Sequence, residues 1–370
     1  MAPSRARFQE LKSLDAILSR AGISSYTRPD PFVLLASQLA QVRSALFDLL
    51  GSSSPALDEI AKYYFLQPSK QLRPLIILLL AQATNGLAKN WEQKHREGAH
   101  DLDSPLSRAD LGIAERMDRR PPRPNAPRPD RRDDPRRLSL LHDDVIDESP
   151  LRRGAPSAPQ AYGSKLAVLG GNFILGRASA ALARLGDPEV VELIASIISN
   201  LVEGEILQMQ EALAPANAWR VYLQKTYMKT ASLMAKGARG AVVLGGCVEG
   251  EVYREVAYAY RRNLGIAFQL VDDILDYESG EATLGNPGGA DLQLGLATGP
   301  ALFAWEEHPQ IGPLIERKFN QPDDSSGVER TRDLALAYAK QARNVLAPLP
   351  DSDAKGALEA LTERVVKRKS

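Results

Sequence analysis

The sequence has almost no cysteine, no long hydrophobic run and no net charge, and each absence excludes a class of function. Cys247 is the one cysteine among 370 residues, which excludes an internal disulfide and a cysteine-rich zinc site. Lys plus Arg and Asp plus Glu both number 46, so the net charge recruits neither nucleic acid nor an anionic membrane. The hydrophobic run that begins at Pro74 is far shorter than the roughly 20 residues of a membrane span. We therefore expect no transmembrane segment and no nucleic-acid partner.

Strand-type alternation of useful length is also missing, whereas apolar residues often recur at three- and four-residue spacing. This spacing predicts amphipathic helices. They are expected from Pro31 to about Leu50, from about Ala56 to Leu66, from Pro74, over Ala161–Leu185, Asp187–Glu211, Trp219–Gly245 and Glu251–Tyr277, and as three helices in the rest of the chain. The sequence thus predicts an all-α fold, a single large helical bundle around a deep central cavity.

Two segments depart from this helical pattern. The stretch from about 90 to 137 contains PPRPNAPRPDRRDDPRR, whose prolines forbid a helix and whose charge density opposes burial. It is interpreted as a disordered insertion, after which a helix begins near Pro135. Residues 1–29 are rich in arginine, but Glu10 and Asp15 interrupt them, so they are interpreted as an extension that is at best the remnant of a targeting segment. Residues 30–370 then form one interrupted domain.

The first chemical signal is the stretch LSLLHDDVIDESPLRRG, which runs from Leu138 to Gly154. Helical spacing places Asp143 and Asp147 one above the other, and like charges at this spacing destabilise a helix. A short acidic helix face is usually only solvated surface, but a hard cation such as Mg²⁺ would also neutralise it. Arg152, beyond the carboxylates, offers a planar fork suited to phosphate.

A second copy of the acidic pattern favours the metal site over a solvated surface. The run FQLVDDILDY repeats the same spacing in Asp272, Asp273 and Asp276. Two acidic helices that face each other across a cavity can hold a cluster of Mg²⁺ ions and, through them, one diphosphate group. The predicted metal-binding residues are the two triads, Asp143, Asp144 and Asp147 with Asp272, Asp273 and Asp276.

Together these motifs resemble the trans-isoprenyl diphosphate synthases. The resemblance rests on SKQLRP from Ser69, DDVID followed by LRRG, GEILQ from Gly204, KTASL from Lys229 and GIAFQLVDDILDY. It covers roughly Asp30 to Trp305 apart from the proline-rich stretch. Within the family, ALDEIAKYY, GRASAALARL and GGADLQLGLAT are most similar to the long-chain polyprenyl branch, which makes the side chain of ubiquinone.

The resemblance implies an enzyme that condenses isopentenyl diphosphate with a geranyl, farnesyl or geranylgeranyl diphosphate, using three Mg²⁺ ions. Of the acidic residues, Asp143, Asp147 and Asp272 would hold the ions and the other three would support them. It further implies a homodimer or heteromer and a mitochondrial location, with the cytoplasm as the alternative. Further site residues are implied by motif position: catalytic Lys229, Thr230 and Gln269, and substrate-binding Lys70, Arg73, Arg152 and Arg153.

Three residues depart from the pattern that the resemblance leads us to expect. Arg136 stands where the family usually has a histidine, Asn172 where it has an aspartate, and Asn286 where it often has a lysine. A half-built site loses function. The alternative is therefore a catalytically impaired or regulatory subunit of a heteromeric synthase, or a wrongly translated proline-rich segment. A class I terpene cyclase fits less well, because the second aspartate motif and the LRRG arginines argue against it.

Overall fold

The computed structural model describes residues 28–67, 71–93, 137–147, 149–152, 154–209, 217–278, 297–308 and 327–368 of the chain. The side chains of residues 137–139 and 209 are not described. Most of the predicted extension and of the predicted insertion lies outside these ranges. The same is true of Lys70, Arg136, Arg153 and Asn286, so the predictions for them stay predictions.

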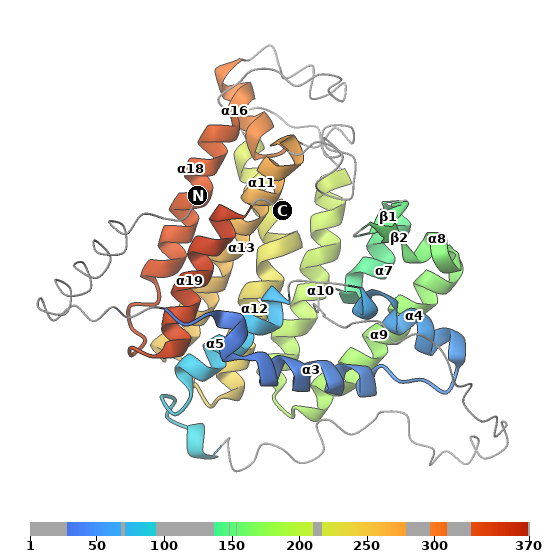
Figure 1. The fold of residues 1–370 in the computed structure, drawn as a ribbon, viewed down its shortest axis with the longest axis horizontal. Helices are drawn as coiled ribbons and strands as arrows, with labels where there is room; N and C mark the ends of the chain where they lie inside the picture. The colour runs from blue at the N-terminus through green and yellow to red at the C-terminus, as the bar shows by residue number, and fades with distance from the viewer. Residues whose placement is uncertain are drawn as a thin grey trace, which may run out of the picture.

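Helices make up nearly all of the regular structure in the described ranges (Figure 1). The all-α prediction is confirmed. The helices are α2 (Pro31–Leu34), α3 (Ala36–Leu49), α4 (Pro55–Leu66), α5 (Leu72–Thr84), α7 (Arg137–Ile146), α8 (Ala158–Tyr162), α9 (Ser164–Arg184), α10 (Pro188–Met209), α11 (Ala218–Thr226), the π-helix η4 (Tyr227–Ala231), α12 (Ser232–Leu244), α13 (Val252–Glu278), α16 (Gly299–Glu307), α18 (Gly327–Asn344) and α19 (Asp353–Lys367). Two strands of two residues each, β1 (Leu151–Arg152) and β2 (Ala155–Pro156), form an antiparallel hairpin.

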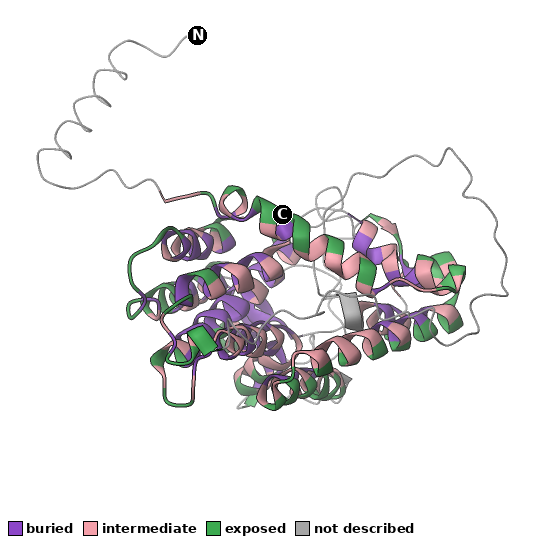
Figure 2. Cartoon of the chain, turned by 90° about the horizontal axis from the view of Figure 1, so that it is seen from below, coloured by how far each residue is buried: buried purple, intermediate pink, exposed green. Residues whose placement is uncertain are grey.

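The helix α13 is the centre of the larger part of the fold. It contacts α12, α16, α18, α19 and η4, and buried residues occur along most of its length. Buried residues gather where the helices of the larger part of the fold pack together (Figure 2). Its apolar residues, such as Leu264, join α5, α12 and α19 in one hydrophobic cluster. The second aspartate motif lies near the carboxyl end of this helix, so its backbone is fixed by the core on several sides.

The first aspartate motif belongs to a smaller group of helices, α4, α7, α8 and α9. Their cluster includes Ile60, Phe65, Leu141 and Ile174, all buried. Figure 1 shows this group on the right, with α10 between it and the helices around α13. Since α10 contacts α12, η4 and α9, it joins the two parts of the fold.

Several predicted helices are interrupted where the backbone needs a different conformation. The helix expected over Ala161–Leu185 is divided at Gly163, whose φ of 83° is the left-handed region that glycine tolerates. The first expected helix is divided at Leu35. Pro74 is the third residue of α5 and not the first, which is tolerated because the first four N–H groups of a helix have no intrahelical partner.

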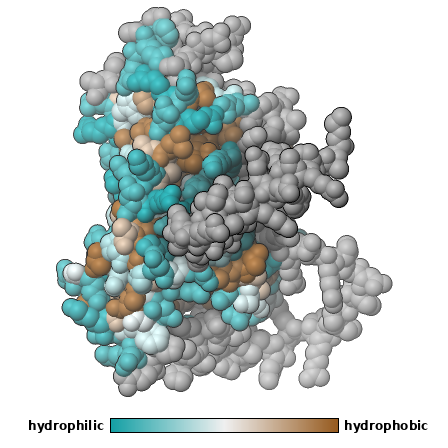
Figure 3. Space-filling view, turned by 60° about the vertical axis from the view of Figure 1, so that its left-hand side comes forward, coloured by the Kyte–Doolittle hydropathy of each residue, from teal (hydrophilic) through white to brown (hydrophobic). Residues whose placement is uncertain are grey.

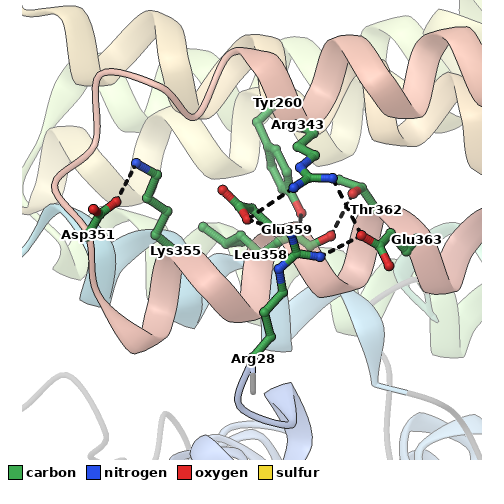
Figure 4. A network of polar contacts seen from close by, with 9 residues as sticks. All are labelled: Arg28, Tyr260, Arg343, Asp351, Lys355, Leu358, Glu359, Thr362 and Glu363. Carbon is green, nitrogen blue, oxygen red and sulfur yellow. Dashed lines mark hydrogen bonds and ion pairs between the residues drawn. The ribbon is translucent and has the colours of Figure 1, made fainter. Parts of the chain in front are cut away.

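The first and last parts of the described chain are held together by ion pairs. Arg28 contacts Glu359 and Glu363 of α19 at 3.2 and 2.5 Å, and Arg343 of α18 approaches the same two carboxylates (Figure 4). Each partly exposed pair contributes about 0.2–1 kcal/mol. On the face in Figure 3, hydrophobic patches are separated by hydrophilic residues.

Candidate active site

The first aspartate motif lies at the carboxyl end of α7, and its three carboxylates differ in exposure. Asp144 is fully buried, Asp143 is half-buried and Asp147 is exposed. The backbone N–H of Asp147 donates to the carbonyl of Asp143 at 2.8 Å, which continues the helical spacing to the last aspartate. Asp143 and Asp147 therefore share one face, as the sequence spacing predicts, and Asp144 points elsewhere.

Asp144 is held by groups from two other elements. Arg152 of β1 donates through Nε at 2.9 Å and through Nη2 to the same carboxylate oxygen, Oδ1. The hydroxyl of Tyr64, from α4, donates to Oδ2 and accepts from the N–H of Ala158 at 2.7 Å. Burial lowers the pKa of Arg152, but the hydrogen bond to Asp144 and the electrostatic interactions with Asp144, Tyr64 and Asp143 together outweigh burial, so this pKa lies above its ordinary value.

Asp147 lies near residues of α10 and η4. Desolvation by the surrounding protein raises its pKa, although the side chain reaches solvent, and the charge of Glu205 raises it further. Lys229 and Arg152 act in the opposite direction. The first motif thus presents negative charge toward the turn that carries Lys229.

That turn is the π-helix η4, in which Lys229 and Thr230 point to different partners. Lys229 Nζ pairs with Glu205 at 2.5 Å and donates to Gln208 Oε1 at 2.9 Å. A Cβ on Gly204 would lie 2.8 Å from Lys229 Cγ, so glycine permits this close approach of α10. Thr230 donates to Gln269 Oε1 at 2.9 Å. Single-turn π-bulges are frequent at functional sites.

The second aspartate motif begins directly after that contact. Gln269 Nε2 donates to Asp273 Oδ1 at 3.0 Å, while Tyr222 and the N–H of Gly299 donate to Oδ2 at 2.6 and 3.2 Å. Burial raises the pKa of Asp273 to about 6, although the hydrogen bonds lower it. The first motif is thus close to Lys229, and the second is joined to Thr230 through Gln269, so both motifs are near the same turn.

Asp272 and Asp276 lie on a different face of α13 from Asp273 and are half-buried. Arg368, at the end of α19, pairs with Asp272, donates to the carbonyl of Phe268 at 2.9 Å and stacks over its ring at 3.8 Å. A cation of this chain therefore already compensates one carboxylate of the second motif.

Arg73 is the described residue of the predicted isopentenyl diphosphate site. It lies in the first turn of α5, is 6% exposed, and its Nη1 is buried without a hydrogen-bond partner among the described atoms. A buried guanidinium nitrogen in this state fits an anionic ligand. Asn172 is exposed on α9, and His142 packs against Gly171 with Nε2 at 3.2 Å from the carbonyl of Val168.

Oxygen donors at this site suit a hard cation. Asp143 of α7 and Asp147, just beyond its end, share one face, and Glu205 adds a third carboxylate near Asp147. Excess negative charge of this kind fits Mg²⁺, which prefers carboxylate oxygens. Within the described ranges, no three His, Cys, Asp or Glu side chains are already gathered as a metal site.

Sequence analysis missed Tyr64, Tyr222 and Arg368. Each contacts an aspartate of the two motifs from 51 to 96 residues away. No local pattern marks these residues, because a tyrosine in an apolar helix or an arginine near a helix end is ordinary.

Comparison with known proteins decides the family. The polyprenyl synthetase family model matches residues 136–331. The chain belongs to this family. A probable mitochondrial hexaprenyl pyrophosphate synthase of Neurospora crassa is 43% identical, over 92% of this chain and 82% of that protein. Decaprenyl-diphosphate synthase subunit 1 of Schizosaccharomyces pombe is 37% identical, over 98% and 97%.

Solved structures agree with the family assignment. A polyprenyl synthase of Caulobacter crescentus, complexed with calcium and isoprenyl diphosphate, is 29% identical, with a TM-score of 0.73 over 92% of this chain and 97% of that chain. The resemblance seen in the sequence is thus confirmed, and the chain is a trans-prenyltransferase. The predicted site residues are not tested by these matches and stay predictions.

Proposed function

We propose that this enzyme condenses isopentenyl diphosphate with a geranyl, farnesyl or geranylgeranyl diphosphate, and that the polyprenyl product serves as the ubiquinone side chain. The observation that supports the proposal is that both aspartate motifs are close to the Lys229–Thr230 turn: the charge of Lys229 acts on Asp147, and Gln269 joins Thr230 to Asp273. The mitochondrial names of relatives support a mitochondrial location. The described helix α9 is long and apolar enough to cross a membrane by length and composition, but it packs against α4, α7 and α8.

Three Mg²⁺ ions are the proposed cofactor, held by Asp143, Asp147 and Asp272, with Asp276 beside them. When bound, the ions would neutralise the charge that develops on the departing diphosphate. Asp144 and Asp273 would support this site from the buried side, since both are engaged by hydrogen bonds there.

The residues of the chain then divide between the two substrates. Arg73, with Lys70 and Arg153, would hold the diphosphate of isopentenyl diphosphate. Lys229, Thr230 and Gln269 line the side of the allylic diphosphate, where Lys229 exchanges its contact with Glu205 for phosphate oxygens. The double bond of isopentenyl diphosphate attacks the allylic carbon as its diphosphate leaves, and the released diphosphate takes the proton that the product loses. Exclusion of water would protect the allylic carbon from hydrolysis while its diphosphate departs.

The test uses purified protein with farnesyl diphosphate, labelled isopentenyl diphosphate and Mg²⁺. Butanol-extractable label is expected, and Asp143→Ala should reduce it at least about a thousandfold, since charge stabilisation by the metals is the main catalytic device. Asp351→Ala is the matched control, because this aspartate is fully exposed and, among the described residues, pairs with Lys355 alone. Absence of product from the wild-type chain, or equal activity of Asp143→Ala, would contradict the proposal.

A second candidate is a subunit that requires a different partner chain. Val191, Ile198, Val202 and Ile206 are exposed on one face of α10, which fits a homodimer or heteromer contact. The Schizosaccharomyces pombe relative is itself named a subunit. Product that appears only after a partner chain is added would favour this candidate, and a homodimer that is active by itself would exclude it.

A further inference from the structure

The two aspartate motifs share a feature beyond their sequence spacing. In each Asp-Asp pair the second carboxylate is buried, with 0% exposure for Asp144 and 2% for Asp273. Each accepts a hydrogen bond from the hydroxyl of a buried tyrosine on another helix, Tyr64 of α4 or Tyr222 of α11. These tyrosines are 80 and 51 residues from their partners in sequence, so the two contacts are made by different parts of the fold.

Because of helix geometry, a contact that fixes one aspartate also fixes the direction of the neighbouring carboxylates. Successive residues of an α-helix are rotated by about 100°, so Asp143 and Asp147 lie roughly a quarter turn away from Asp144. The same holds for Asp272 and Asp276 relative to Asp273. If the second aspartate is fixed, the helix cannot rotate about its axis. The first and last carboxylates of the motif then always point to the same side. Misplacement of catalytic groups by as little as 1 Å can cost a hundredfold in rate.

From this repeated arrangement we propose that Tyr64 and Tyr222 are positioning residues. Each hydroxyl fixes the second aspartate of one motif, so that the first and last aspartates of that motif are presented to metal. The inference rests on the proposed function, since it names the residues that orient its metal ligands. Asp144 and Asp273 act here as anchors of the two helices, and the tyrosines act on metal only through them.

Each of the two tyrosine–aspartate contacts is connected to further elements of the fold by additional hydrogen bonds. Tyr64 also accepts from the N–H of Ala158 at 2.7 Å, which ties α4 and α7 to the start of α8. Asp273 also accepts from Gly299 at the start of α16 and from Gln269, which binds Thr230 of η4. Gln269 joins Asp273 to the turn that carries Lys229. Loss of the contact between Tyr222 and Asp273 should therefore also disturb the proposed site for the allylic diphosphate.

The experiment compares tyrosine-to-phenylalanine variants, which remove one hydroxyl each and keep the ring. Tyr64→Phe and Tyr222→Phe are the test variants. Tyr63→Phe is the control on α4, because its hydroxyl donates to the carbonyl of Pro156 at 2.8 Å. Tyr260→Phe is the control on α13: its ring is fully buried, and its hydroxyl donates to the carbonyl of Leu358 at 2.8 Å. Both controls lose a hydrogen bond, but neither loses a contact with a carboxylate.

Two measurements separate positioning from general stability. Mn²⁺ binding to the substrate-free chain is measured by calorimetry, and the Mg²⁺ dependence of activity is measured beside it. Loss of an outer group that orients a metal site typically costs 10–100-fold in affinity, so about a tenfold weaker binding is expected for each test variant. The KM for isopentenyl diphosphate should stay within about twofold, because Arg73 lies on α5. The controls should bind Mn²⁺ as the wild type does.

A double-mutant cycle tests whether Tyr64 acts through Asp144. In the Asp144→Asn background, Tyr64→Phe should change Mn²⁺ affinity little further, whereas independent residues would give additive effects. Additive effects, wild-type Mn²⁺ affinity in Tyr64→Phe and Tyr222→Phe, or equal losses in the controls would each overturn the inference. Amide hydrogen exchange over residues 137–147 should be faster in Tyr64→Phe and unchanged in Tyr63→Phe. A wild-type chain that makes no product but loses Mn²⁺ affinity in the test variants would overturn the proposed function and leave this inference standing.

Discussion

The two buried aspartates at the centre of the site are neutralised in different ways. Asp144 accepts from the guanidinium of Arg152, a full positive charge, in addition to Tyr64. Asp273 accepts only from uncharged donors in the contacts described above, namely Tyr222, Gln269 and the N–H of Gly299. The cation of the second motif is instead on its outer face, where Arg368 pairs with Asp272.

This difference shows where the uncompensated negative charge lies in each motif. In the first motif, the charge of the buried Asp144 is neutralised by Arg152. The excess negative charge lies on the exposed side, where the charge of Glu205 raises the pKa of Asp147 further. In the second motif the excess lies inside, at a carboxylate whose pKa burial raises to about 6. A buried charge without a counter-charge destabilises the folded state, whereas a carboxylate near solvent stays hydrated and costs little free energy in the absence of a ligand.

The largest expected effect comes from removing the charge of the balanced carboxylate. Asp144→Asn leaves Arg152 largely buried without its counter-charge, so we expect a loss of about 3 kcal/mol in the free energy of unfolding. Asp273→Asn should cost about 1 kcal/mol, because it mainly weakens one hydrogen bond to a neutral donor. Urea unfolding of both variants at pH 7 is the measurement. A larger loss for Asp273→Asn than for Asp144→Asn would contradict the comparison.

A smaller contrast is expected at two glycines where the aspartate helices make close contacts with their neighbours. A Cβ on Gly265 of α13 would lie 2.9 Å from the backbone Cα of Ala231, whereas the atoms nearest to one on Gly171 of α9 belong to the ring of His142. A side chain can rotate away and a backbone cannot. Gly265→Ala should therefore cost about 2 kcal/mol and Gly171→Ala about 1 kcal/mol. Thermal unfolding of the pair checks this order, and Gly240→Ala, where the nearest atom is 3.5 Å away, is the control.

The pH dependence of stability should show the uncompensated charge of the second motif. Folding raises the pKa of Asp273 from an ordinary value of 3.8 to about 6, so the folded state binds this proton more tightly than the unfolded state does. Its contribution to stability is therefore greatest below pH 4, falls as the pH rises to about 6, and is constant above. The stability lost in Asp273→Asn should accordingly be greater at pH 4.5 than at pH 7. Unfolding by urea at both pH values tests this, and a pH-independent difference would contradict it.

Local features of the site could be predicted from sequence. The spacing of Asp143 and Asp147 depends only on the helical repeat, and α7 begins within two residues of the helix start expected near Pro135. The segment expected as one helix over Trp219–Gly245 is continuous, but it contains the π-helix at Tyr227–Ala231. An extra residue in one turn leaves the apolar pattern almost unchanged, so periodicity cannot reveal it.

Long-range contacts could not be predicted in the same way. Tyr64 is one of two adjacent tyrosines, and only the packing of α4 and α7 against the same helix, α9, decides that Tyr64 and not Tyr63 contacts Asp144. Arg368 reaches Asp272 because α19 runs beside α13, which no periodicity in α19 specifies. The sequence thus predicts which residues carry the chemistry, and the fold decides which residues hold them.

The smallest expected effect concerns the cation on the outer face of the second motif. Arg368→Gln frees Asp272 from an ion pair that a metal must replace, and such a partly exposed pair contributes about 0.2–1 kcal/mol. Mn²⁺ should therefore bind the substrate-free variant about two- to fivefold more tightly, as measured by calorimetry. Arg343→Gln is the charge-matched control, since within the described part of the chain it breaks the ion pairs with Glu359 and Glu363 and none with an aspartate motif. If Arg368→Gln bound Mn²⁺ more weakly than the wild type, Arg368 would support the metal site and not compete with it, and the second motif would then depend on a cation just as the first depends on Arg152.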